Sequence, residues 1–147
     1  MKDTNISRRS VICGALALSL GFGADFLPEA AQAAAGITQL KNGKIQVTLA
    51  ANKALAKVGG AVILNLNDGS QLAIVRSSAA MKGYSALSLT CPHNFATVGE
   101  VGGKWVCPAH GSNFALDGKF LSSPVPGFRK NLNSIPLAAT ATTLTIG

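Results

Sequence analysis

The chain has 147 residues, of which 48% are hydrophobic and 13% are charged, a length and composition that suit one domain. Its net charge of +7 suggests nucleic acid as a possible partner. However, the sequence has no arginine run, recognition helix or interleaving of basic and aromatic residues. We therefore exclude nucleic acid. The first 33 residues carry three basic and three acidic side chains, so the whole positive charge falls on residues 34–147.

Residues 1–33 have the features of an export signal. Arg8 and Arg9 lie in a charged segment that resembles a twin-arginine motif, an apolar stretch follows at 11–24, and Ala31-Gln32-Ala33 offers a small-residue cleavage site. We expect this segment to be cleaved, leaving a mature domain at 34–147 in the periplasm. Two alternatives stay open, an ordinary secretory signal and an uncleaved membrane anchor. The apolar run is shorter than the ~20 residues that span a bilayer, which favours cleavage.

From Ile37 onward, short segments rich in β-branched residues alternate with turn residues, a pattern typical of strands. Turn signals occur at Asn42-Gly43, at 67–70, at Gly102-Gly103 and at Asp117-Gly118. Residues 52–60 fit either a helical turn or a loop. Short strands with frequent turns predict an all-β fold, an antiparallel sandwich or small barrel. The expected strands lie within 37–50, 61–66, 71–76, 84–89, 98–101, 104–106, 114–121, 132–137 and 142–146.

Two short boxes carry the residues with the most distinctive chemistry, Cys91-Pro92-His93 and Cys107-Pro108-Ala109-His110. Each box offers one thiolate and one imidazole, a combination that suits zinc or iron–sulfur chemistry rather than magnesium or calcium. The chain has three cysteines and two histidines, and Cys13 lies in the segment expected to be removed. The mature protein would keep two of each, all inside the boxes.

The pattern C-x-H…C-x-x-H, both prolines, and the Gly111-Ser112 that follows the second box resemble the Rieske family, over a stretch from about 61 to 128. The resemblance implies a Rieske-like sandwich whose tip is made by two hairpin loops. It also implies a [2Fe–2S] cluster, with Cys91 and Cys107 on one iron and His93 and His110 on the other. The rival is a tetrahedral zinc site, but zinc fingers usually pair like residues in each knuckle, whereas each box here is mixed.

The resemblance extends to the surroundings of the cluster. Ser112 matches a family serine that donates a hydrogen bond to a bridging sulfide, and the proline-rich stretch that begins at Pro124 matches a third loop covering the cluster. The plainer alternatives are a cap on the turn for Ser112 and a surface turn for 124–127. High-potential members carry one more cysteine in each loop, joined in a disulfide. The matching positions here are Ala96 and Ala109, so we expect no such clamp.

By resemblance, the function is electron transfer without a catalytic site of its own. The three acidic residues of 34–147, Asp68, Glu100 and Asp117, offer little for acid–base catalysis. We expect a periplasmic carrier of one electron. Its basic surface suits redox partners with an acidic docking face, or attraction to anionic headgroups. The alternative is the iron–sulfur subunit of a larger oxidoreductase, such as a quinol–cytochrome c reductase or an arsenite-oxidase-like complex. Membrane contact would then come through that complex or an uncleaved signal. The export signal disfavours a ferredoxin of a ring-hydroxylating dioxygenase.

Phe114 generates the first prediction, because high-potential Rieske subunits have a tyrosine there whose hydroxyl bonds to a cysteine sulfur. Fewer donors to the sulfurs destabilise the reduced, more negative state. We therefore expect a reduction potential in the lower or middle part of the family range of roughly −150 to +300 mV. Protein-film voltammetry should give Phe114→Tyr a higher potential than the wild type. An unchanged or lower potential would refute the attribution.

Overall fold

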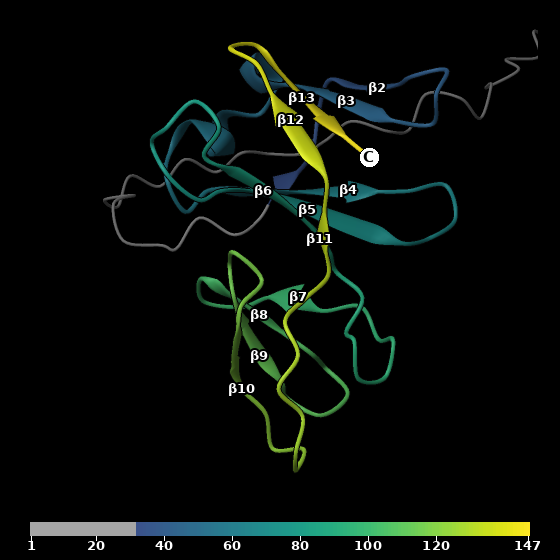
Figure 1. Cartoon of the computed structure of the whole chain (residues 1–147), viewed down its shortest axis with the longest axis vertical. Helices are drawn as coiled ribbons and strands as arrows, with labels where there is room; N and C mark the ends of the chain where they lie inside the picture. Colours follow the sequence, from purple (N-terminus) through teal and green to yellow (C-terminus); the bar gives the residue numbers. More distant parts are fainter. Residues whose placement is uncertain (1–31) are drawn as a thin grey trace, which may run out of the picture.

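A computed structural model describes residues 32–147 (Figure 1). The fold is all-β, as predicted, and it also contains two short 3-10 helices. The predicted export signal and its twin arginines lie outside the described residues, apart from Gln32 and Ala33. In chain order the elements are β1 Gln32–Ala33, β2 Ile37–Gln39, β3 Ile45–Thr48, η1 Leu49–Ala51, η2 Lys53–Ala56, β4 Ala61–Asn65, β5 Gln71–Arg76, β6 Tyr84–Ser88, β7 Gly99–Glu100, β8 Lys104–Val106, β9 Asn113–Ala115, β10 Phe120–Ser122, β11 Ser134–Ile135, β12 Leu137–Ala139 and β13 Thr143–Ile146.

The described strands form three sheets that follow one another along the long axis of the molecule (Figure 1). The middle sheet has the order β1-β4-β5-β6-β11. It lies between a base sheet, β12-β13-β3-β2, and a tip sheet, β10-β9-β8-β7. The pairings between these strands are antiparallel except for β1 with β4, which is parallel.

Strand β5 shows why the middle sheet can be covered on both sides. Its four central residues, Leu72 to Val75, are all buried. Successive side chains of a strand point to opposite faces. Accordingly, Ala73 and Val75 join the apolar cluster of the tip, while Leu72 and Ile74 join that of the base. A strand covered on both faces is apolar throughout instead of alternating.

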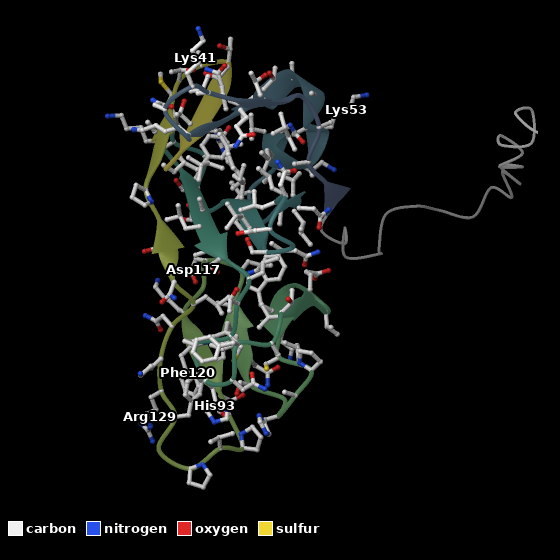
Figure 2. All side chains as sticks on the ribbon, turned by 90° about the vertical axis from the view of Figure 1, so that its right-hand side faces the viewer. Lys41, Lys53, His93, Asp117, Phe120 and Arg129 are labelled. Carbon is white, nitrogen blue, oxygen red and sulfur yellow. The ribbon has the colours of Figure 1, made fainter. Side chains whose placement is uncertain are left out.

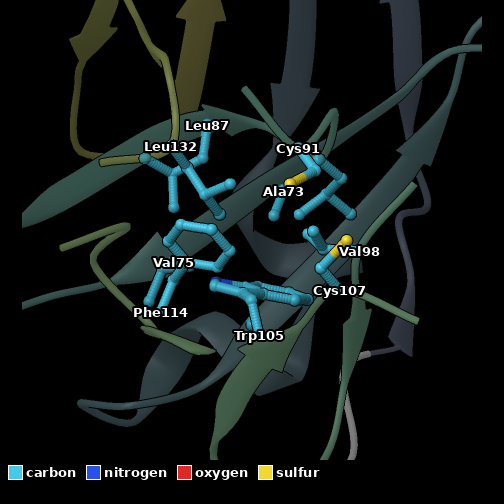
Figure 3. Close-up of a cluster of buried hydrophobic side chains, with 11 residues drawn as sticks. Ala73, Val75, Leu87, Cys91, Val98, Trp105, Cys107, Phe114 and Leu132 are labelled. Carbon is cyan, nitrogen blue, oxygen red and sulfur yellow. The ribbon is translucent and has the colours of Figure 1, made fainter. Parts of the chain in front are cut away.

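The apolar cluster of the tip connects the middle sheet to both boxes (Figure 3). Trp105 and Phe114 are fully buried in it, together with Cys91 and Cys107. The indole N–H of Trp105 donates to the carbonyl of Leu116 at 3.1 Å, so the one polar atom of this side chain has a partner. Strand β6 leads toward the first box and β8 leads directly into the second, so the core fixes where both boxes begin.

The four predicted turns all connect neighbouring antiparallel strands. The C-terminal region differs from expectation, because the predicted strand at 132–137 is two strands. Strand β11 pairs with β6 in the middle sheet, whereas β12 pairs with β13 in the base sheet. Pro136 separates them, and a proline has no N–H to continue a ladder.

Residues 49–56 form two 3-10 turns. Within residues 32–147 we find no helix with the length and apolar character needed to cross a bilayer.

Candidate metal centre

The two boxes fold into loops of the same kind. In the first loop, residues 91–96, the carbonyl of Cys91 accepts the N–H of Phe95 at 2.9 Å, and the N–H of Cys91 donates to the carbonyl of Ala96 at 2.8 Å. In the second loop, residues 107–112, the carbonyl of Cys107 accepts the N–H of Gly111 at 2.9 Å, and its N–H donates to the carbonyl of Ser112 at 2.8 Å. The backbone of each cysteine is thus hydrogen-bonded to the backbone of the residues four and five positions after it. The histidine of each box lies within the loop that these bonds close.

These loops separate the sulfurs from the imidazoles. Cys91 and Cys107 are 0% and 1% exposed and lie in the tip's apolar cluster (Figure 3). Burial raises the pKa of the Cys91 thiol, and the neighbouring Cys107 thiol adds to the rise. His93 is half-buried and His110 is exposed, and their ring centroids are 4.9 Å apart. The structure therefore brings all four predicted ligands to the tip, with sulfur inside and nitrogen outside.

This donor set fits a two-iron cluster. Sulfur ligands on one side and imidazoles on the other match the two unlike irons of a Rieske centre. Among residues 32–147, no three or more His, Cys, Asp or Glu side chains surround one ion position. The boxes offer the two donor types that such a cluster needs, two thiolates and two imidazoles.

A third loop, residues 123–128, contacts both of the others. The hydroxyls of Ser112 and Ser123 share a hydrogen bond of 2.8 Å, and Ser112 is fully buried. On the other side, the Phe128 ring packs edge-to-face on His93, with 5.3 Å between ring centroids. Pro124, which the sequence singled out, is itself exposed. The contacts of this loop therefore come from its serine and its phenylalanine.

Three residues near the boxes were missed from the sequence. Asn94, which directly follows His93, lies with its Oδ1 3.6 Å from the Cys107 Sγ and so joins the first loop to the second. Ser123 and Phe128 flank the prolines of the third loop. Nothing in the sequence spacing of these two residues indicated which side chains they would contact. Phe114, which the sequence singled out, is buried in the same apolar cluster as both cysteines.

The acidic residues of the described region serve turns. The Asp68 carboxylate accepts bonds from the N–H and hydroxyl of Ser70, which lower its pKa. Glu100 accepts the N–H of the residue three positions on. Asp117 pairs with Lys119 at 2.9 Å, and the hydrogen bond with this lysine lowers its pKa. All three carboxylates therefore stabilise turns.

A scan against protein-family models matches residues 35–136 to the Rieske [2Fe-2S] domain, a stretch that contains all three loops. The chain belongs to the Rieske [2Fe-2S] domain family. The cofactor of this Rieske domain is a [2Fe–2S] cluster, and the domain transfers electrons through it.

Solved structures include other Rieske proteins. The plasma membrane Rieske protein PetC3 of the cyanobacterium Synechocystis PCC 6803 is 28% identical, with 65% of this chain and 94% of that chain covered and a TM-score of 0.49. The apo form of the quaternary ammonium Rieske monooxygenase CntA is 21% identical, with a TM-score of 0.52. That match covers 65% of this chain but 30% of the monooxygenase, and it supports the fold alone. A search of curated proteins finds no match.

Phe95 generates a prediction about stability. Phe95 and Gly111 occupy the same position of the paired loops, and their φ angles are +62° and +72°. This left-handed conformation suits glycine but costs other residues about 1–2 kcal/mol. Because the Phe95 side chain is 80% exposed, it recovers little of that cost by packing. Phe95→Gly should therefore increase the free energy of unfolding by up to about 1 kcal/mol, measured by chemical denaturation of the loaded protein.

The matched control is Val101→Gly. Val101 is also an exposed apolar loop residue, at 57%, but its φ is not positive. Its replacement should decrease stability by about 0.5–1 kcal/mol, because glycine gains more freedom in the unfolded chain. Equal destabilisation by the two substitutions would show that Phe95 is not strained.

Proposed function

We propose that this chain is an exported periplasmic electron carrier whose cluster is held by Cys91 and Cys107 at one iron and by His93 and His110 at the other. The observation that carries the proposal is the paired arrangement of the boxes, with both sulfurs in the core and both imidazoles toward the surface. When bound, the cluster supplies a site that accepts and releases one electron.

The residues around the cluster site keep it rigid and partly dry. The backbone bonds that close the first two loops hold both cysteines in place. On the outer side, the Phe128 ring packs edge-to-face with His93 and also packs on Phe120, with 5.7 Å between the two phenylalanine ring centroids. His110 is exposed, so its ring is the part of the proposed cluster site that a docked partner can contact. Because the loops are rigid, we expect their geometry to change little when the cluster takes up an electron.

Charge and apolar surface at the tip favour a protein partner with an acidic face. Arg129 and Lys130 follow the third loop and are exposed, and Figure 2 shows Arg129 and His93 toward the same end of the molecule. The first loop adds the exposed ring of Phe95, two residues from His93. An apolar contact with basic residues beside it would dock on an acidic partner surface and bring it close to the imidazoles, with attraction that weakens as salt rises.

The periplasmic location rests on the sequence features of residues 1–33. A cluster is assembled in the cytoplasm, and the twin-arginine route carries proteins that have already folded, so the motif and the cofactor support each other. A retained signal would instead anchor the domain to the membrane. The alternative role, as the iron–sulfur subunit of a larger oxidoreductase, would use the same tip against a permanent partner.

Redox titration with iron and acid-labile sulfide analysis tests the proposal. The wild-type protein should contain two irons and two sulfides per chain and take up one electron reversibly. Cys107→Ser and His110→Ala should each lose most of the iron and the visible absorption, because each removes one of two ligands at an iron. Circular dichroism should show that the β fold is retained.

The matched control is Ala109→Ser, an exposed position between the two ligands of the second loop. It should keep its iron, its sulfide and its one-electron titration. A colourless wild-type protein with a single bound zinc, or full iron content in Cys107→Ser, would contradict the proposal.

A further inference from the structure

A line of hydrogen bonds runs from the third loop to the buried side of the second loop. The N–H of Val125 donates to the Ser123 Oγ at 3.1 Å, and the Ser123 Oγ lies 2.8 Å from the Ser112 Oγ. Ser112 is 0% exposed, and its carbonyl accepts the N–H of Cys107 at 2.8 Å. The line therefore ends on the buried hydroxyl of a residue whose own carbonyl is bonded to the backbone of Cys107, a cysteine proposed as a ligand.

The direction of the bond between the two serines decides where the Ser112 proton points. A hydroxyl has one proton to donate and two lone pairs with which to accept. If Ser112 donates to Ser123, its proton is used, and the proton of the half-buried Ser123 can reach water. If Ser123 donates to Ser112, the Ser112 proton is free. Because Ser112 is inaccessible to solvent, that proton then needs an acceptor inside the protein.

We propose that Ser123 is a positioning residue that donates its proton to Ser112 and thereby directs the Ser112 proton toward the sulfur atoms of the cluster. The direction follows from two features. Ser123 already accepts from Val125, and an oxygen that accepts a hydrogen bond becomes a stronger donor. The sulfurs of the site carry negative charge, which attracts the proton of a buried hydroxyl that belongs to the same loop as Cys107. This inference rests on the proposed ligands of the second loop.

The consequence is a link between the third loop and the reduction potential. A hydrogen bond to cluster sulfur stabilises the reduced, more negative state and raises the potential. Polarisation by Ser123 strengthens the bond that Ser112 donates. Ser123 thus acts on the potential entirely through Ser112, which sets it apart from a residue that merely supports the loop.

The experiment is a double-mutant cycle in which protein-film voltammetry measures the potential of the loaded protein. Ser112→Ala and Ser123→Ala should each lower the potential, Ser112→Ala by more. Ser123→Ala should cause no further shift in the Ser112→Ala background, because its effect needs the Ser112 hydroxyl. Ser123→Thr keeps the hydroxyl and should retain the wild-type potential.

Ser122→Ala is the matched control. The neighbouring Ser122 is exposed, and its hydroxyl accepts from the Asn113 Nδ2 at 3.3 Å, outside the line to Ser112. Its removal should leave the potential unchanged. A shift as large as that of Ser123→Ala would show a general response of the loop and would overturn the inference.

The sign of the shift separates the remaining outcomes. A higher potential in Ser123→Ala would mean that Ser112 had been donating to Ser123 and was released toward the cluster, which contradicts the inference. No shift, or the same shift with and without Ser112, contradicts it as well. A wild-type protein without a two-iron EPR signal would instead refute the proposed function, so the two failures are distinguishable.

Discussion

Two short loops must hold sulfur in the core and nitrogen at the surface, although the residues concerned are only two or three positions apart. The chain meets this constraint by closing each loop with two backbone hydrogen bonds. They join the cysteine to the residues four and five positions after it. Closure forces the fourth position into a left-handed conformation, which is met by glycine in one loop and by a strained phenylalanine in the other. The middle and tip sheets supply the fixed points from which both loops start.

The third loop completes this arrangement by side-chain contacts. The positions at which relatives with a disulfide would have cysteines are Ala96, which is half-buried against the tip's apolar cluster, and Ala109, which is exposed. Neither can cross-link the loops. Ser123 and Phe128 contact one loop each from the same segment, so a single stretch of chain bridges the two boxes. Such contacts are weaker than a covalent bond, but one of them reaches the buried hydroxyl of Ser112, through which we propose that it affects the reduction potential.

Much of the fold could be predicted from the sequence because it depends on local chemistry. Asn-Gly, Asp-Gly and Gly-Gly signals located the hairpins, since few residues adopt the backbone angles of tight turns. The four predicted ligands were found because their types and spacing are specific. Their roles as ligands, the cleavage after Ala33 and the periplasmic location stay predictions.

Long-range packing accounts for what the sequence did not show. The apolar run of β5 was compatible with several kinds of strand, and only the sheets on either side explain it. The split at Pro136 depends on which sheet each half joins. Likewise, no local pattern indicated that Ser123 would reach Ser112, or that Phe95 would adopt a positive φ.

Pulsed EPR of the reduced protein, labelled with ¹⁵N-histidine, tests the central claim most directly. The chain has two histidines, His93 and His110, so the label marks both proposed imidazole ligands and no other residue. We predict hyperfine couplings from two ¹⁵N nuclei in the spectrum of a two-iron cluster. A cluster signal with one nitrogen coupling, or with none, would contradict the account.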